Sequence, residues 1–397
     1  MNSPFRAYTR CPADLLAPSR TDDHSAEIDD LRLERYRDNS ITDVHATLSP
    51  ESLIRSAYYT LRPLLSVGMR KHLQRFALRG WEKIPFPAWP VDTGVEKLVA
   101  DHWMQLLEVH DTDTLPFVWF WPDGHRSCAV MTHDVETAAG RDFCGHLMDM
   151  EAAVGVVSSF EVVPEERYEV TPAYLDSIRR AGCEVCIHGL SHDGHLFSSR
   201  TGFLERAARI NAYAANWRAV GFRSPVMYRN LDLIGHLDFE YDMSVPNVGH
   251  LDPQRGGCCT VMPYFIGDTL ELPLTTIQDY PLYNNLGRYD MDLWREQTDI
   301  VVGRHGLLSF IIHPDYTIER RAQDLFRELL DHLCALRDDR GTWLALPGEV
   351  NDWWRLRSRM ELQERNGRWC VTGPSCDRAK VGLACREAGG LVYRVQD

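Results

Sequence analysis

The stretch that decides the fold spans residues 183–195 and reads CEVCIHGLSHDGH. Its apolar start fits a short buried strand that ends at His188, four residues before His192. Two imidazoles at that spacing can face one metal ion if the chain makes a helical turn after the strand. Two histidines on one face of a surface helix have the same spacing, so the pair indicates a metal site only if suitable partners occur elsewhere in the chain.

The chain around this stretch alternates short apolar segments with amphipathic ones. Strands are expected at residues 127–132, 155–160, 184–188, 269–273, 307–313 and 343–346. Helices are expected at residues 95–107, 143–153, 172–181, 203–219, 290–304 and 318–337. Alternation of strands and helices over roughly 200 residues predicts an α/β fold with a parallel sheet or barrel.

Acidic residues follow the first of these strands. Asp134 and Glu136 come soon after the apolar run 128–131, and in extended backbone they share a face. One carboxylate can then bind a metal while the other acts as a base. A solvated strand end, or an acid in the first turn of a helix, gives the same pattern.

Two more segments carry residues suited to hydrolysis. Arg223, in the run GFRSP, has a guanidinium that can hold a carboxylate ionised. His313 ends an apolar strand and can donate a proton to a leaving group. Alone, the first could be a surface arginine and the second a core histidine. Asp193 and His195, beside the histidine pair, are candidates for supporting hydrogen bonds.

The order of these groups strengthens the interpretation. A carboxylate pair, a histidine pair, an arginine and a histidine follow one another along the chain, and three of the four follow predicted strands. In a parallel α/β barrel, functional groups gather at the carboxyl ends of the strands. The set supplies ligands for a divalent metal, a base, a group that orients the base, and an acid. Metal-dependent hydrolysis needs these four parts.

Composition limits the class of protein. The chain has 397 residues, of which 44% are hydrophobic, so it can bury a large core in two or three domains, or in one barrel with extensions. Its net charge of −14 argues against nucleic acid as a partner, because phosphate binding needs a positive surface. Neither a signal peptide nor a membrane span is expected, and the 11 cysteines form no regular framework. We therefore expect free thiols and a cytoplasmic location.

Four regions are expected along the chain. They are a loose N-terminal arm at 1–48, a helical extension at 49–117, the barrel at 118–356 and a small β-rich appendage at 357–397. Within the extension, residues 51–83 are rich in arginine and lysine. A helix with one solvated face is the common explanation of such a segment. The alternative is a basic patch that contacts an anionic membrane surface or a lipid-linked substrate.

On these motifs, residues 118–354 resemble the polysaccharide deacetylases with a NodB-homology domain. That family has an acidic motif after a strand, a histidine pair with three residues between, an Arg-x-Pro motif and a late Leu-x-His. The matching residues here are Asp134, Glu136, His188, His192, Arg223, Pro225 and His313. The resemblance implies a distorted (β/α) barrel of about seven strands.

The resemblance also implies a metal site. A divalent metal, zinc in the first instance, would be held by Glu136, His188 and His192. Asp134 would be the base. The family's adjacent aspartates are replaced here by Asp134 and Glu136 with Val135 between them. The reverse assignment of the two acids therefore stays open.

The remaining roles follow from the same resemblance. Arg223 would keep the base ionised, and His313 would be the acid. The family's Leu-x-His is Ile-Ile-His in this chain. Asp279 and Asp242 are the candidates for the acid that supports His313.

The implied activity is metal-dependent removal of an N-acetyl or similar acyl group from a carbohydrate. A lipid-linked or nucleotide-linked amino sugar fits a cytoplasmic location better than a wall polymer does. One alternative is a hydrolase of small non-peptide amides on the same barrel. Another is an inactive carbohydrate-binding or scaffold protein. A thiol-based protein built on Cys183 and Cys186, or on residues 258–259, is a weaker alternative because thiols in a buried strand usually pack.

Overall fold

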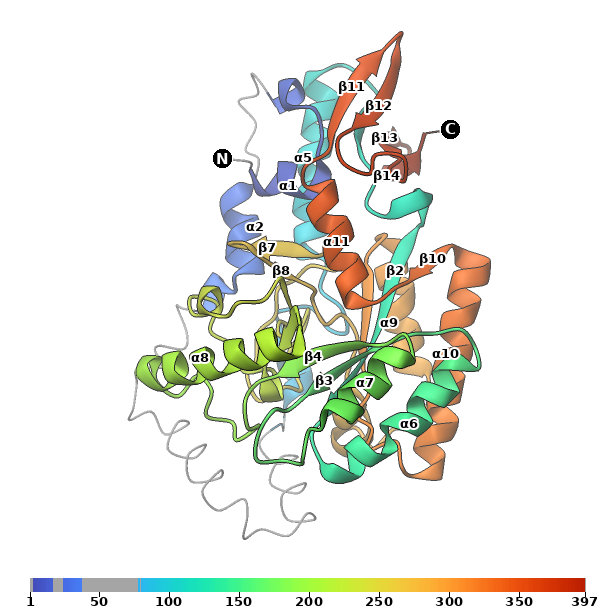
Figure 1. Ribbon diagram of the computed structural model, residues 1–397. Helices are drawn as coiled ribbons and strands as arrows, with labels where there is room; N and C mark the ends of the chain where they lie inside the picture. Colours follow the sequence, from blue (N-terminus) through green and yellow to red (C-terminus); the bar gives the residue numbers. More distant parts are fainter. Residues whose placement is uncertain (1–2, 17–23, 38–77, 79, 397) are drawn as a thin grey trace.

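The sheet is built around β2 (Ser127–Val135), in which all residues are buried. A strand buried on both faces belongs to a parallel sheet covered by helices. The computed structural model describes residues 3–16, 24–37, 78 and 80–396, and Figure 1 shows β2 running through the middle of the molecule.

The central strand has three parallel neighbours. β10 (Thr342–Leu344) pairs with its first half and β3 (Ser159–Val162) with its second half, while β9 (Leu307–Ile311) pairs with its middle. From β3 the sheet continues in the order β4, β5, β6, β8 and β7, and only the edge strand β7 is antiparallel to its neighbour. These strands are β4 (Glu184–His188), β5 (Gly221–Arg223), β6 (Tyr241–Asp242), β7 (Tyr264–Ile266) and β8 (Thr269–Glu271).

Threonine side chains join the far end of this sheet back to β9. Thr275 Oγ1 donates to the carbonyl of Leu307 at 2.7 Å and accepts from the amide of Ser309 at 3.1 Å. Thr276 Oγ1 donates to the carbonyl of Ser309 at 2.7 Å. The sheet therefore curls into a barrel whose last seam is made by side chains instead of a backbone ladder. This confirms the predicted distorted (β/α) barrel.

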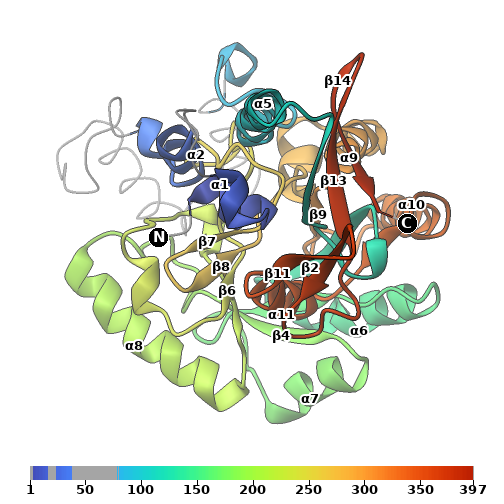
Figure 2. The ribbon, with the colours of Figure 1, turned by 90° about the horizontal axis from the view of Figure 1, so that it is seen from above.

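Helices cover the outside of the barrel. Figure 2 shows α8, α7, α6, α10 and α9 around the strands. Their bounds are α6 (Ala138–Ala152), α7 (Pro172–Arg180), α8 (Arg200–Trp217), α9 (Asp292–Gly303) and α10 (Arg320–Arg340). Three begin with a side-chain cap, as Thr137 accepts from the amide of Gly140 at the start of α6. This cap turns the chain immediately after Glu136.

The predicted long elements occur in the structure, with ends that differ by a few residues. The strand expected at 184–188 coincides with β4. The sequence analysis did not identify β5, β6 and β7, which have three, two and three residues. Segments so short contain too few residues to show a hydrophobic period.

The prediction of a loose N-terminal arm at 1–48 was wrong for those of its residues that the structure describes. α1 (Pro4–Thr9) and α2 (Ser25–Arg32) fold against α5 (Gly94–Val109), in the position seen in Figure 2 between α8 and α9. Phe5 is fully buried and packs on Trp103 of α5. Glu34 forms a buried ion pair with Arg229. A polar segment with few apolar residues can still be ordered when those few residues pack against the hydrophobic core of the rest of the protein.

The C-terminal region forms two small sheets at one end of the barrel (Figures 1 and 2). After α11 (Pro347–Arg357) come β11 (Glu361–Arg365), β12 (Arg368–Thr372), β13 (Val381–Glu387) and β14 (Gly390–Val395). β11 pairs with β12, and β13 pairs with β14 and with β1 (Thr114–Val118). The predicted β-rich tail is confirmed. Because β1 joins the tail sheet, the division of the chain into four regions remains a proposal.

Two further predictions concern membranes and thiols. Residues 51–77 and 79 of the basic segment lie outside the described residues. None of the helices in the described parts combines the length and the apolar character needed to cross a bilayer. The cysteines are all free. Burial raises the pKa of both Cys183 and Cys186, which favours packing over thiolate chemistry.

Candidate active site

The proposed catalytic residues meet at the carboxyl ends of four strands. β2 supplies Asp134 and, one residue beyond its end, Glu136. β4 ends at His188, β5 ends at Arg223, and His313 follows β9. Because these strands are parallel, their carboxyl ends lie at the same end of the barrel. Residues 179 positions apart in sequence are thereby brought within reach of one another, as His133 and Ile312 show by hydrogen bonding.

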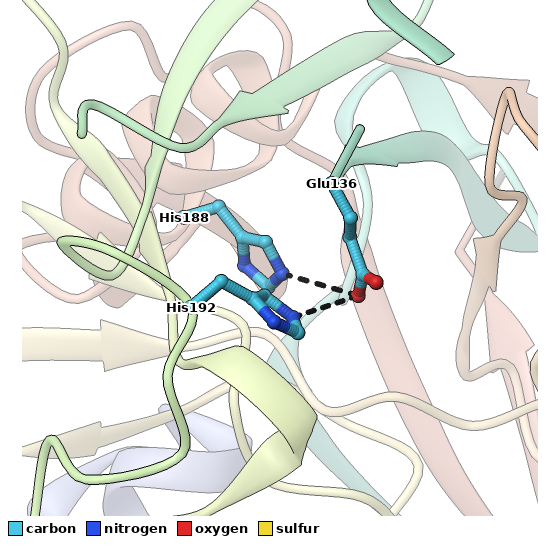
Figure 3. A group of neighbouring side chains, drawn as sticks. All are labelled: Glu136, His188 and His192. Carbon is cyan, nitrogen blue, oxygen red and sulfur yellow. Dashed lines mark ion pairs between the residues drawn. The ribbon is translucent and has the colours of Figure 1, made fainter. Parts of the chain in front are cut away.

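Figure 3 shows three side chains that converge on one point. Glu136 Oε1 lies 2.8 Å from His192 Nε2 and 3.8 Å from His188 Nε2. Among the described residues this is the group whose ligand-type atoms all lie within 4.8 Å of one another. Both Nε2 atoms are buried. Although they lie close to Glu136, neither has a partner in hydrogen-bonding geometry among the described residues. A metal ion between these two nitrogens and Glu136 would give all three groups a well-directed partner.

The hydrogen bond on the other side of His188 fixes its ring. Nδ1 lies 3.2 Å from the carbonyl of Arg223 and therefore carries the proton. Nε2 then presents its lone pair to the point where Glu136 and His192 meet. A backbone carbonyl that orients an imidazole in this way is a common feature of metal sites.

The loop between the two histidines differs from the prediction. The sequence analysis expected a helical turn, but the chain makes irregular bends, with φ of +62° at Gly189 and +53° at His192. Pro225 packs on Gly189 so closely that a Cβ there would lie 2.4 Å from Pro225 Cγ. Pro225 of the Arg-x-Pro motif therefore shapes the loop that carries His192.

Asp134 is held by Arg223 instead of the histidines. Arg223 Nη1 donates to Asp134 Oδ1 at 2.6 Å, and the other oxygen, Oδ2, lies 3.7 Å from His188 Nε2. Arg223 is itself fixed by Thr132 Oγ1 at 2.8 Å and by the carbonyl of Met243 at 3.1 Å. One oxygen of Asp134 is thus engaged, and the second faces the site.

His313 is supported by Asp279, one of the two predicted candidates. Its Nδ1 lies 2.6 Å from Asp279 Oδ1, and its backbone amide donates to Oδ2 at 2.7 Å. Nε2 points to the site and lies 3.5 Å from Glu136 Oε1. Asp242 was the wrong candidate, because it lies on β6 and accepts a hydrogen bond from Ser244.

The other predicted supporting residues lie outside this group. Asp193 accepts two hydrogen bonds from Arg206, at 2.9 and 2.7 Å. His195 Nδ1 lies 3.2 Å from Ser198 Oγ. Both residues shape the loop after His192, and neither contacts the converging side chains.

The charges around the site set the protonation of its acids and of His313. Burial opposes ionisation of Glu136, yet His192, His188 and His313 together hold its pKa well below the ordinary value. Burial likewise opposes ionisation of Asp134, and Arg223 lowers its pKa nonetheless. Burial opposes the charge of His313, but Asp279 and Glu136 raise its pKa well above the ordinary value. At neutral pH the site contains two carboxylates and a protonated His313.

Two buried groups behind the site were not predicted. Glu161 of β3 accepts from the amide of His133 at 2.9 Å and lies 3.5 Å from Arg223 Nη1. His133 lies 2.9 Å from the carbonyl of Ile312 and 2.8 Å from Glu151. A signal for Glu161 existed, because the strand expected at 155–160 stops one residue before it.

Comparison with known proteins locates the fold. No protein-family model and no curated protein matches the chain. Among solved structures, a protein from Mycobacterium smegmatis described as a polysaccharide deacetylase matches with a TM-score of 0.50 at 20% identity, over 63% of this chain and 98% of that chain. A protein from Pseudomonas aeruginosa PAO1 described as a polysaccharide deacetylase, and the Puue allantoinase, each match with a TM-score of 0.46 at 12% identity. These matches cover 59% of this chain and 93% and 92% of theirs. The chain therefore has the barrel fold of the polysaccharide deacetylases.

Proposed function

We propose that this protein is a metal-dependent hydrolase that removes an N-acetyl or similar acyl group from a carbohydrate. The observation that carries the proposal is the convergence of Glu136, His188 and His192, with a carboxylate held by an arginine on one side and a histidine held by an aspartate on the other. The residue types that hydrolysis needs converge here, and a second group orients three of them: the carbonyl of Arg223 for His188, the Arg223 guanidinium for Asp134, and Asp279 for His313.

The donor set fits a divalent metal of the zinc type. Two neutral imidazoles and one carboxylate are the three protein ligands of many catalytic zinc sites. Three lone pairs are available to bind the metal. Nε2 of His188 and Nε2 of His192 supply two of them, and the ionised carboxylate of Glu136 supplies the third. When bound there, such a metal acts as a Lewis acid that makes water a better nucleophile and polarises an acyl carbonyl.

Asp134 is proposed as the base. Its Oδ2 faces the site, and Arg223 holds the carboxylate in its ionised form. An ionised carboxylate at this position accepts a proton from the attacking water as the new carbon–oxygen bond forms. Arg223 also fixes the direction of that carboxylate, because its guanidinium is held by two other buried groups, the carbonyl of Met243 and Thr132 Oγ1.

His313 is proposed as the acid. Nε2 carries a proton toward the site, and Asp279 stabilises the resulting imidazolium through Nδ1. When the carbon–nitrogen bond breaks, the leaving nitrogen takes this proton and departs as a neutral amine. The products are a small carboxylic acid and a free amino sugar.

The finer identity of the substrate is proposed from the sequence. A cytoplasmic, lipid-linked or nucleotide-linked amino sugar is the class that we favour, with residues 51–83 as the segment that contacts an anionic surface. An inactive carbohydrate-binding or scaffold protein is less favoured, because the converging side chains include every residue type that the proposed metal site and acid–base pair need.

The test is acetate release from a panel of N-acetylated sugars, with the Asp134→Asn variant as the comparison. We expect the wild-type protein to release acetate and the variant to lose about 10²–10⁴-fold in kcat, the range for loss of a general base. Equal turnover by both proteins would rule out Asp134 as the base.

A second candidate is hydrolysis of a small non-peptide amide. One observation favours it. Glu136 is the most exposed of the three proposed metal ligands, and its side chain is only 15% exposed to solvent. Ligands that are so little exposed suit a small substrate. Adding linear and cyclic amides to the same panel separates the candidates, since turnover of amides without turnover of acetylated sugars supports the second.

A further inference from the structure

An open groove of about 780 Å³ lies between the C-terminal sheets and the barrel. The lining residues that matter for its chemistry are the aromatic Trp119, His305, Trp369 and Tyr393 and the basic Arg126, Arg368 and Arg394. Arg126 immediately precedes β2, and His305 stands just before β9. The groove is therefore at the amino ends of the barrel strands, whereas the candidate active site is at the carboxyl ends. Its volume is in the range of sites that hold small molecules.

The groove is rich in positive charge that the described residues do not neutralise. Arg126 and Arg368 are exposed, and neither guanidinium has a hydrogen bond or an ion pair with a described residue. Arg394 pairs with Glu387 at 2.5 Å. In a chain with a net charge of −14, two guanidinium groups on one groove that have no partner in the described parts of the chain form a local site for an anion. Guanidinium groups bind carboxylates and phosphates through two parallel hydrogen bonds.

Aromatic rings form the rest of the groove. Trp369 of β12 and Tyr393 of β14 are half-buried and line the groove. Trp119 also lines the groove, fixed by a hydrogen bond from Nε1 to the carbonyl of His125 at 2.7 Å and by an edge contact with His305 at 5.0 Å between ring centroids. A groove lined by aromatic rings and exposed cations suits a ligand that has both a flat apolar face and a negative group.

We propose that this groove is a binding site for an acidic saccharide. The apolar face of a sugar ring would lie on Trp369 and Tyr393, and its carboxylate or phosphate would be bound by Arg126 and Arg368. The choice of a saccharide over another anion rests on the proposed function. Because the groove is at the opposite end of the barrel from Asp134, it holds the ligand without taking part in hydrolysis.

The test uses isothermal titration calorimetry of the full-length protein with trigalacturonic acid and, as the neutral probe, tri-N-acetylchitotriose. The variant is the double substitution Arg126→Gln with Arg368→Gln. Its matched control is Arg180→Gln with Arg320→Gln, which removes two exposed arginines from α7 and α10 that have no partner among the described residues. Both double variants change the net charge by the same amount.

We expect the wild-type protein to bind the acidic trisaccharide. The groove variant should bind it with a Kd that is about tenfold higher or more, because it lacks the charged hydrogen bonds of two arginines. The control variant should keep the wild-type Kd. The proposal is overturned if the wild type does not bind the acidic probe, or if both double variants weaken binding equally. It is also overturned if inorganic phosphate alone binds as tightly as the trisaccharide, since the aromatic rings would then contribute nothing.

A second readout separates this proposal from the proposed function. Binding in the groove requires no turnover, so it persists in a protein that releases no acetate from any substrate. In that case the groove stands and the deacetylase assignment fails. Acetate release from an uncharged monosaccharide should be equal in the wild type and the groove variant. Acetate release together with no binding of trigalacturonic acid would leave the function in place and remove the groove.

Discussion

At the scale of single residues, the site distinguishes two acids that the sequence leaves interchangeable. Asp134 and Glu136 are two positions apart and both are ionised, but their neighbours differ. Glu136 faces two imidazoles, whereas one oxygen of Asp134 is engaged by Arg223. The same oxygen cannot bind a metal without breaking a fully buried ion pair, which costs several kcal/mol.

Substitution of each acid should therefore have a different result. Glu136→Gln removes a charged ligand, so it should lower the bound metal as well as kcat. Asp134→Asn should lower kcat about 10²–10⁴-fold with the metal retained. Metal content and kcat measured on the same preparations check this. Metal lost in Asp134→Asn and kept in Glu136→Gln would mean that the two roles are reversed.

Asp279 gives a prediction about pH. His313 must be protonated to act as an acid, so activity is lost as pH rises through its pKa. Asp279 is the main group that raises this pKa against the effect of burial. Asp279→Asn should therefore move the alkaline limb of the kcat profile to lower pH, and Asp242→Asn, a change in the other predicted candidate, should leave that limb in place. An unmoved limb in Asp279→Asn would show that His313 is not the group that titrates.

At this scale the sequence predicted most of the candidate site. Asp134, Glu136, His188 and His313 lie at or just beyond the ends of apolar runs that are visible in the sequence. Arg223 lies at the end of β5, which the sequence analysis did not identify, and it was predicted from its residue type and the Arg-x-Pro motif alone. The choice between Asp279 and Asp242 was not visible, because it depends on which loop passes beside His313 in space.

At the scale of elements, the loop after β4 determines where His192 lies. Gly189 has a left-handed φ and lies against Pro225, so any Cβ would both strain the backbone and displace the proline. A loop of this kind leaves no periodic signal, which is why the sequence suggested a helical turn. The short strands β5 and β6 were missed for a related reason: they are defined by their neighbours in the sheet and not by their own pattern.

Gly189→Ala should lower the bound metal although no ligand is changed. Gly182→Ala, at the other end of β4, is the matched control, because Gly182 also has a left-handed φ but its Cβ would meet no atom closer than 3.9 Å. Both variants carry the backbone cost, about 1 kcal/mol, and only the first carries the contact with Pro225. Equal metal content in the two variants would show that Pro225 does not position the loop.

At the scale of the whole molecule, the N-terminal helices, the barrel and the C-terminal sheets share one core. Phe5, Trp103, Phe117 and Trp353 belong to the same buried cluster. Arg357 of α11 donates to the carbonyls of Tyr8 and Val118 within it. Sequence reasoning treats each region by its own composition. It therefore described residues 1–48 as loose, although α1 and α2 are stabilised by contacts with residues that follow much later in the chain.

Glu96 of α5 should make the stability of this shared core depend on pH. Its Oε1 accepts from Thr260 Oγ1 at 2.5 Å, and burial raises its pKa from 4.5 to about 7. The carboxyl pKa is higher in the folded protein than in the unfolded chain. The stability that this group contributes is therefore fully present below the unfolded-state pKa, and it is lost as pH rises through the folded-state pKa. The wild type should therefore lose about 3 kcal/mol relative to Glu96→Gln between about pH 4.5 and 7. Chemical unfolding of both proteins across this range checks it, and parallel stability curves would contradict it.

The most direct test of the central claim is the metal content of the purified protein. We expect about one zinc or similar divalent ion per chain after dialysis against zinc, measured by elemental analysis. The double variant His188→Ala with His192→Ala should lose it, while His195→Ala, a histidine of the same loop that lies outside the site, should keep it. No bound metal in the wild type, or an equal amount in the double variant, would contradict the assignment of Glu136, His188 and His192 as the metal site.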